Sequence, residues 1–170
     1  MLIEKNISLK PLNTFGMNVV AKEFASVETK QDLAKILNTN LSNLLVLGGG
    51  SNILLTKDVN ALVLHINIKG IEIVSVYENN VRVRVAAGEN WHEFVMFCVN
   101  NNYGGLENLS LIPGNVGAAP MQNIGAYGVE LKDTFVEVGK NASLQKIFLK
   151  ALHPNDQQVR ALEIFLSIAN

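Results

Sequence analysis

Apolar and polar residues along the chain follow patterns that predict strands and helices in alternation. Residues 19–27 and 61–68 are short apolar runs rich in β-branched side chains, as is typical of strands. Residues 43–52 form an apolar run that stops in glycine, which predicts a buried strand feeding a tight turn. Between the strands predicted at 19–27 and 43–52, residues 29–40 place Leu33, Ile36 and Leu37 on one face of a predicted helix.

The middle of the chain contains the clearest hairpin and the clearest helix. Residues 71–88 alternate between apolar and polar on both sides of a turn at Glu78-Asn79-Asn80, which predicts a β-hairpin. In the helix that follows, we expect Asn90 to cap the N-terminus and the glycines at 104 and 105 to end it. Its predicted apolar face consists of Trp91, Phe94, Val95, Cys98 and Val99.

The last part of the chain predicts one strand and two helices. Residues 134–138 read as a short strand. Residues 143–152 have apolar positions at helical spacing, and Pro154 ends that helix. Residues 155–169 predict a second amphipathic helix, capped by Asn155 or Asp156.

Composition narrows the class of protein. Hydrophobic residues make up 48% of the 170-residue chain and charged ones 17%, which indicates a globular protein. A formal net charge of -1 with scattered Lys and Arg gives no footprint for nucleic acid. We expect no membrane span and no signal peptide, and the lone Cys98 favours a reducing cytoplasm. His65, His92 and His153 are too far apart in sequence to suggest a metal site.

The first glycine-rich turn is a candidate for binding a phosphate. Glycine lets backbone N–H groups approach an anion closely, and the turn consists of Gly48, Gly49, Gly50, Ser51 and Asn52. It is neither a dinucleotide fingerprint, because Ile53 stands where the third glycine belongs, nor a Walker A loop. An ordinary tight turn between strands is the alternative.

The second candidate is the uncharged stretch from Ile112 to Gly128, "IPGNVGAAPMQNIGAYG". A helix starting near Val116 would offer free N–H groups and its positive dipole end to an anion. Gln122 and Asn123 can donate and accept hydrogen bonds, which suits a heterocycle or a phosphate. A tightly packed crossing of small residues is the alternative, but two such uncharged, amide-rich turns together favour a nucleotide-type cofactor.

Five blocks in register resemble a known family. The blocks are "PLNTFG", "LGGGSN", "AAGENWHEFV", "GLENLSLIPGNVGAAP" and "QNIGAYGVEL", spanning Leu9 to about Val138. Together they resemble the UDP-N-acetylenolpyruvoylglucosamine reductases (the MurB flavoenzymes of bacterial cell-wall synthesis), in the longer form of that family. An unrelated nucleotide-binding domain remains the alternative if the blocks are a coincidence.

The resemblance implies an α+β FAD-binding unit of the vanillyl-alcohol-oxidase type, made of two small subdomains at 1–67 and 68–139. It also implies that both glycine-rich stretches line FAD. The resemblance implies that four residues lie along the diphosphate and ribityl chain: Pro113, Gly114, Gly117 and Ala118. It also implies that three residues lie nearer the flavin: Ile124, Gly125 and Tyr127.

The chemistry that the resemblance implies passes hydride from NADPH through FAD to the enolpyruvyl group of a UDP-sugar, with a serine as proton donor. The family's arginine motif, its serine segment "GNAGSFFKNP" and its late glutamate do not occur in these 170 residues. We therefore assign no catalytic residue and expect the chain alone to be inactive, with the UDP-sugar bound only if the missing domain is supplied. Residues 140–170 are interpreted as a shortened remnant, a truncation or a replacement pair of helices.

Several reactive residues near these blocks have ordinary structural interpretations. We expect Trp91 to begin the apolar helix face and His92 to lie at the surface. A buried, inert thiol is expected for Cys98. Glu89 and Glu107 are expected to be structural charges, with contact to a ribose as the alternative. Tyr127 has small neighbours that leave room for its ring, with a core tyrosine as the alternative.

Overall fold

The computed structural model describes residues 2–37, 43–138 and 163–169. These residues form two compact units, with the chain passing from one to the other between Ile68 and Lys69. Unit 1 contains the described residues up to Ile68. Unit 2 contains residues 69–138 and 163–169.

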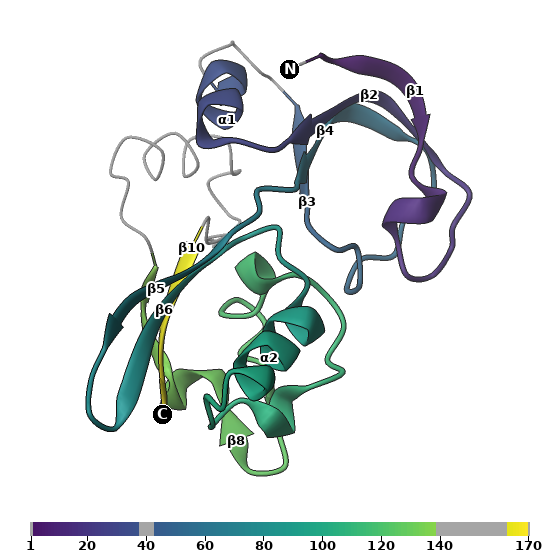
Figure 1. Ribbon diagram of the computed structural model, residues 1–170. Coiled ribbons are helices and arrows are strands. Elements are labelled where there is room, and N and C mark those ends of the chain that lie inside the picture. Colours follow the sequence, from purple (N-terminus) through teal and green to yellow (C-terminus); the bar gives the residue numbers. More distant parts are fainter. Residues whose placement is uncertain (1, 38–42, 139–162, 170) are drawn as a thin grey trace. The chain divides into compact units, whose positions relative to one another are not determined.

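Unit 1 is built on a four-stranded mixed sheet (Figure 1). Its strands are β1 (Glu4–Ser8), β2 (Val20–Val27), β3 (Leu44–Leu47) and β4 (Val59–Ile66), and a 3-10 turn, η1 (Lys10–Leu12), follows β1. The order across the sheet is β1-β2-β4-β3, with β1 antiparallel to β2 and both β2 and β3 parallel to β4. The strands predicted at 19–27, 43–47 and 61–68 are therefore confirmed.

Helix α1 (Lys30–Leu37) follows β2 in the sequence and precedes β3, the edge strand that pairs in parallel with β4. The Thr29 hydroxyl oxygen accepts a hydrogen bond from the amide of Asp32 at 3.0 Å, which satisfies one of the free donors of the first turn. Leu33 and Ile36 are buried, as their spacing predicts. The asparagine closure expected at 38–40 lies outside the described residues.

One core cluster of unit 1 lies between its sheet and the turns that follow β1 and β3. These buried side chains form one cluster: Leu9, Val19, Ala21, Phe24, Leu47, Leu55 and Val63. Leu9 comes just before η1, and Leu55 comes just after the glycine turn. Both turns are thus anchored to the sheet by an apolar side chain in the same core.

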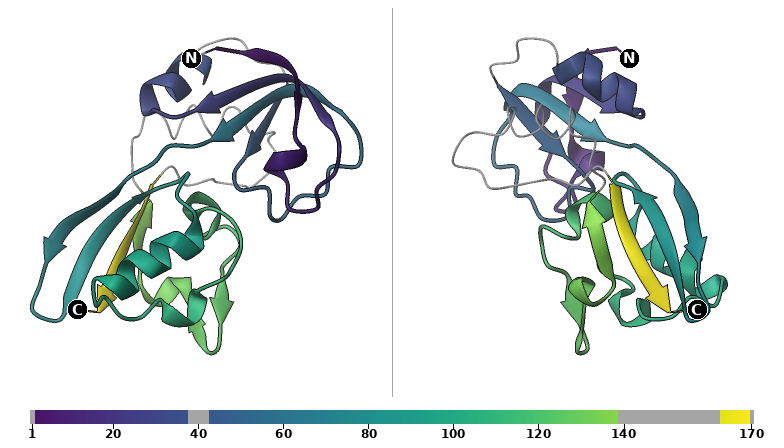
Figure 2. Two further views of the ribbon diagram at one scale, coloured as in Figure 1. Left: turned by 45° about the vertical axis from the view of Figure 1, so that its right-hand side comes forward. Right: turned by 90° about the vertical axis from the view of Figure 1, so that its left-hand side faces the viewer.

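Unit 2 contains a second four-stranded sheet, with strands β5 (Ile71–Val76), β6 (Asn80–Ala86), β9 (Phe135–Val138) and β10 (Glu163–Ala169). All neighbouring pairs are antiparallel, in the order β5-β6-β10-β9. Figure 2 shows β10, in yellow, between β6 and β9. The predicted hairpin and the predicted strand at 134–138 are confirmed.

Strand β10 corrects the sequence prediction of a helix over 155–169. Residues 163–169 pair along the whole of β6, from Glu163 opposite Ala86 to Ala169 opposite Asn80. The segment is rich in β-branched and aromatic residues, and partners on both sides stabilise the extended conformation over a helix. The helix predicted at 143–152, and the part of the second one at 155–162, lie outside the described residues.

Helix α2 (Trp91–Asn100) covers one face of the unit 2 sheet (Figure 1). Asn90 caps it as predicted, with its side-chain oxygen accepting from the Glu93 amide at 3.0 Å. The helix ends before the predicted glycines, because Asn102 takes the left-handed conformation with φ 61°. Val99 was expected on the buried face but is 40% exposed. No described helix has the length and apolar character to cross a membrane.

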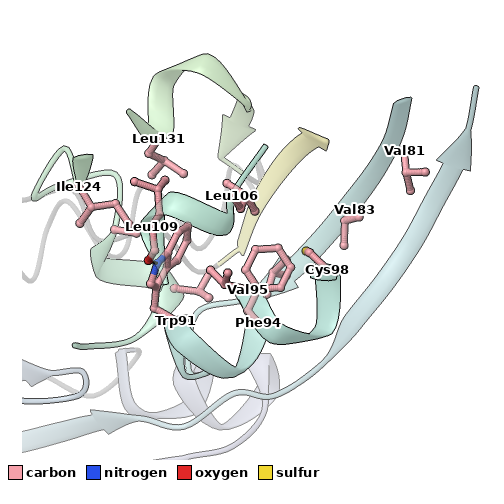
Figure 3. Packing of buried hydrophobic residues seen from close by; sticks show 13 residues of the cluster. Val81, Val83, Trp91, Phe94, Val95, Cys98, Leu106, Leu109, Ile124 and Leu131 are labelled. Carbon is pink, nitrogen blue, oxygen red and sulfur yellow. Dashed lines mark hydrogen bonds between the residues drawn. The ribbon is translucent and has the colours of Figure 1, made fainter. Parts of the chain in front are cut away.

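The buried face of α2 packs against the valines of β6 and against the irregular segment 106–133 (Figure 3). That segment contains three 3-10 turns and a small hairpin: η2 (Glu107–Leu109), η3 (Val116–Ala118), β7 (Gly125–Ala126), β8 (Val129–Glu130) and η4 (Leu131–Asp133). The indole N–H of Trp91 donates to the Leu109 carbonyl at 2.7 Å in this core. Trp91 therefore ties the start of α2 to the segment that precedes the uncharged stretch.

Candidate cofactor site

The residues predicted to bind a dinucleotide fall into two sets, one in each unit. The set in unit 1 is the turn from Gly48 to Asn52, directly after β3. The set in unit 2 belongs to the stretch from Pro113 to Tyr127. Each set has its own local geometry, and each is described in turn.

The three glycines after β3 differ in what surrounds them. Gly50 is buried at a positive φ of 63°, and a Cβ atom there would overlap the backbone oxygen of Leu12. At Gly48, by contrast, an added Cβ would meet no atom within 4 Å. Gly50 is thus required by packing inside unit 1, whereas the space at Gly48 is open to a ligand.

The exposed side of this turn has the donors that a phosphate needs. Gly49 and Asn52 are exposed and Ser51 is half-buried. Within the described ranges, no protein group accepts a hydrogen bond from the backbone amides of Gly49 and Asn52. An open glycine position beside two available amides fits the diphosphate of a dinucleotide, which small uncharged turns bind through backbone N–H groups.

A second turn lies against the first, and sequence reasoning gave it no role. The amide of Thr14 donates to the carbonyl of Gly50 at 3.0 Å, so the "PLNTFG" block touches the glycine turn directly. The Asn13 side chain is only 6% exposed and bonds three backbone groups of the same loop. The signal in the sequence was a short uncharged block in which Asn and Thr stand between apolar residues and a glycine follows.

In unit 2, the structure corrects the prediction of a helix starting near Val116. Only the three-residue turn η3 forms there. Its first amides are already bonded, because Val116 N–H donates to the Glu89 carbonyl at 2.9 Å and Gly117 N–H donates to the Ala87 carbonyl at 3.0 Å. These two donors therefore do not bind an anion, and no helix dipole assists them.

The first residues of the uncharged stretch run beside the segment that leads into α2. Trp91 N–H donates to the Gly114 carbonyl at 3.0 Å, and Asn90 pairs with Asn115. Pro113 is exposed, Gly114 and Ala118 are half-buried, and Gly117 is buried. Of these predicted contacts, Pro113 has the most accessible surface, whereas Gly117 is buried and bonded to Ala87.

The last residues of the stretch divide between core and surface. Ile124 is 8% exposed and belongs to the core of unit 2, and its contact with a cofactor stays a prediction. Gln122, Asn123 and Gly125 are exposed, and Tyr127 is 90% exposed. The alternative of Tyr127 as a core residue is therefore wrong, and its ring is open to a partner.

Two acidic residues near the stretch have structural partners. One carboxylate oxygen of Glu89 accepts from the Gly70 amide at 2.6 Å, and the other lies 3.9 Å from the Lys69 ammonium. Glu107 accepts from the Gly105 amide at 2.6 Å. Both act as structural charges, in agreement with the sequence interpretation.

The thiol and the imidazole on α2 are likewise structural. Cys98 is fully buried, and burial, with a smaller contribution from the charge of Glu107, raises the pKa of its thiol to about 12. His92 is half-buried, and its Nδ1 accepts a hydrogen bond from the Leu111 amide at 3.2 Å. Neither group is presented as a nucleophile or as a general base.

The profile of the FAD binding domain family matches residues 21–141. The chain belongs to this family. Its cofactor is therefore FAD, and the open glycine turn with its available amides fits that assignment.

Curated relatives give a finer likeness over the same part of the chain. The UDP-N-acetylenolpyruvoylglucosamine reductase of Flavobacterium johnsoniae is 56% identical over 137 residues. Its counterpart in Amoebophilus asiaticus is 49% identical over 138 residues. These alignments cover 80% and 79% of this chain but only 41% of each relative, so the chain spans about two-fifths of their length.

A solved structure agrees with the fold. The UDP-N-acetylenolpyruvylglucosamine reductase (MurB) from Thermus caldophilus superposes with a TM-score of 0.66 at 22% identity, covering 100% of this chain and 62% of that chain. The fold is the FAD-binding one that the sequence predicted, an α+β arrangement with mixed and antiparallel sheets.

Proposed function

We propose that this chain is the FAD-binding portion of a UDP-N-acetylenolpyruvoylglucosamine reductase. The observation that supports this most directly is the 56% identity to such a reductase over 137 residues. On this proposal the product is UDP-N-acetylmuramate, a precursor for peptidoglycan, made in the cytoplasm and needed for cell shape, the cell cycle and division. Bound FAD would accept hydride from NADPH and deliver it to the enolpyruvyl group.

On this proposal the chain's own residues position the cofactor and do not perform acid–base chemistry. The amides of Gly49 and Asn52 bind diphosphate oxygens in the open space at Gly48. Several such bonds to a charged phosphate, at about 1.5–3 kcal/mol each, are sufficient without Lys or Arg. In unit 2, Gln122, Asn123 and Tyr127 have exposed polar groups that can bond a ligand.

Cofactor binding is tested by purifying the chain and titrating it with FAD. We expect yellow protein, or a colourless apoprotein that binds added FAD and quenches its fluorescence. The Gly48→Ala variant should bind more weakly, because its added methyl group fills the open space, with Asn60→Ala, an exposed change on β4, as the control. A folded chain that ignores FAD would contradict the proposal.

Turnover is tested separately. We expect the chain alone to show no NADPH oxidation that depends on the UDP-enolpyruvyl sugar, because the serine, arginine and glutamate that the family resemblance implies are missing from these 170 residues. As a positive control, the remaining portion of the Flavobacterium relative is added to the chain, and NADPH oxidation is then expected. Formation of muramate product by the chain alone would overturn this part of the proposal.

One observation favours a second candidate function, a non-catalytic FAD-binding or scaffold module that pairs with a partner chain. Strand β10 lies beyond the family match yet forms an inner strand of the unit 2 sheet. A sheet completed by divergent sequence suits a module that folds without the catalytic portion. Pull-down from the source cell, followed by size-exclusion chromatography with and without FAD, distinguishes a stable partner from a chain that acts alone.

A further inference from the structure

The turn from Pro11 to Gly16 is held in one shape by a buried side chain. The Asn13 amide nitrogen donates to the carbonyls of Leu9 at 2.7 Å and Met17 at 3.1 Å, and its oxygen accepts from the Met17 amide at 2.8 Å. Both donors and the acceptor of this side chain are thus used. The Gly16 amide closes the turn by donating to the Asn13 carbonyl at 3.0 Å.

This turn is fixed against the glycine turn inside unit 1. Thr14 N–H donates to the Gly50 carbonyl at 3.0 Å, and the Leu12 carbonyl fills the place where Gly50 would have a Cβ atom. The two backbones therefore touch at Gly50. Phe15 follows Thr14 directly, so its Cα is one residue from this contact.

Phe15 is the third residue of a four-residue turn, and it is 63% exposed. The apolar residues on either side of the turn behave differently, since Leu9 and Val19 are buried in the core of unit 1. The turn is thus held by a buried Asn13 and a left-handed Gly16, with φ 63°, while the phenyl ring of Phe15 is exposed to water. An exposed ring on a rigid support is typical of a contact surface.

The two turns that touch at Gly50 are both uncharged. Residues 11–16 and residues 48–52 contain no acidic or basic side chain. One of the two touching turns has an exposed aromatic ring and the other has available backbone amides, which fits a ligand that has a flat ring and a phosphate in one molecule. FAD, the cofactor of this family, has a heteroaromatic ring at each end of its diphosphate.

We propose that Phe15 packs against a planar heteroaromatic ring of the bound dinucleotide and that the Pro11–Gly16 turn is a second wall of the cofactor site. This inference rests on the proposed FAD-binding function. It extends the site to residues that lie outside the family match at 21–141.

The test measures the dissociation constants of FAD, FMN and ADP for the full chain and for four variants. Phe15→Ala and Phe15→Leu remove the ring, and Phe15→Trp keeps one. Leu2→Ala is the matched control, a large exposed apolar residue of unit 1 that precedes β1. The melting temperature of each variant without ligand is measured alongside, because an exposed substitution should leave it nearly unchanged.

We expect Phe15→Ala and Phe15→Leu to weaken FAD binding about two- to tenfold, the range for loss of one aromatic contact. Phe15→Trp should bind as the unsubstituted chain does, with its added indole fluorescence quenched by FAD, and Leu2→Ala should bind normally. A parallel loss for FMN assigns the ring to the flavin, and a parallel loss for ADP assigns it to adenine.

Two negative results have different meanings. If the unsubstituted chain binds FAD and Phe15→Ala binds it equally well, the role of Phe15 is overturned while the proposed function stands. If the folded, unsubstituted chain does not bind FAD at all, both proposals are overturned.

Discussion

The backbone oxygen of Leu12 occupies the position where a Cβ atom on Gly50 would lie. Two turns separated by more than thirty residues of sequence are therefore in van der Waals contact through their backbones. Gly50 and the nearby Gly48 therefore have different roles. Gly50 makes the contact possible, and Gly48, with open space around it, leaves room for a ligand.

The first prediction compares Ala substitutions at these two glycines. Gly50→Ala should lower the free energy of unfolding by at least about 2 kcal/mol, because it combines a positive φ with a clash against backbone. Gly48→Ala should change it by no more than about 0.5 kcal/mol and should weaken FAD binding. Urea denaturation of both variants, with FAD titration of the folded one, provides the measurement. Equal stability losses would contradict the distinction.

The second prediction concerns the indole of Trp91. Trp91→Phe leaves the buried Leu109 carbonyl without its donor and should cost about 1–3 kcal/mol, in addition to the loss of packing. Glu93→Gln, an exposed change in the first turn of the same helix, is the control and should be nearly neutral. Thermal unfolding followed by circular dichroism measures both. A Trp91→Phe variant as stable as the control would show that the indole N–H contributes little.

Local patterns in the sequence were sufficient to predict the elements whose structure depends on residues close in sequence. In the hairpin at 71–86, β6 alternates between buried valines and polar residues, and α2 has a side-chain cap at Asn90, so each could be predicted from nearby residues. Both signals depend on contacts between residues close in sequence, at most fourteen apart where Ile71 pairs with Val85. They remain valid whatever the rest of the chain does.

Elements that depend on distant partners could not be predicted in this way. The segment 163–169 has apolar residues compatible with a helix, but its pairing with β6, nearly eighty residues earlier, makes it a strand. Near Val116 the amides find carbonyl acceptors at Ala87 and Glu89 instead of a helix of their own. The contact between Thr14 and Gly50 is likewise long-range, which explains why the "PLNTFG" block had no predicted role.

The third prediction tests β10 as part of the sheet. Leu166→Pro removes a strand hydrogen bond in the middle of β10 and should speed hydrogen exchange at the amides of β6 and β9 that face it. Ala169→Pro changes only the last pair, opposite Asn80, and should act locally. Exchange is followed by mass spectrometry on the full chain. Unchanged protection of β6 in Leu166→Pro would mean that β10 does not stabilise the sheet in solution.

The fourth prediction follows from the raised pKa of Cys98. The folded thiol ionises at a pKa of about 12 and the ordinary value is 9.0, so the unfolded state loses the proton first as pH rises. Stability from this group is fully present below pH 9 and is lost as the pH rises toward 12. A thiol reagent at pH 8 should therefore react far more slowly with folded than with urea-unfolded protein. Rapid labelling of the folded chain would contradict the buried assignment.

The fifth prediction concerns the tip of the β7–β8 hairpin, where Tyr127 and Gly128 have positive φ angles of 53° and 81°. Two-residue turns of this kind favour Asn followed by Gly, so a tyrosine there is strained as well as 90% exposed. Tyr127→Asn should raise the free energy of unfolding by about 0.5–1 kcal/mol and weaken FAD binding or shift the flavin absorption band.

Tyr127→Phe separates the ring from the hydroxyl, because it keeps the strain and the aromatic surface and removes only the polar group. If the hydroxyl bonds the cofactor, Tyr127→Phe should weaken binding nearly as much as Tyr127→Asn does. If the ring alone makes the contact, Tyr127→Phe should bind normally. A stabilised Tyr127→Asn variant with unchanged affinity and an unchanged flavin spectrum would remove Tyr127 from the cofactor site, and its strain would then need another partner to explain it.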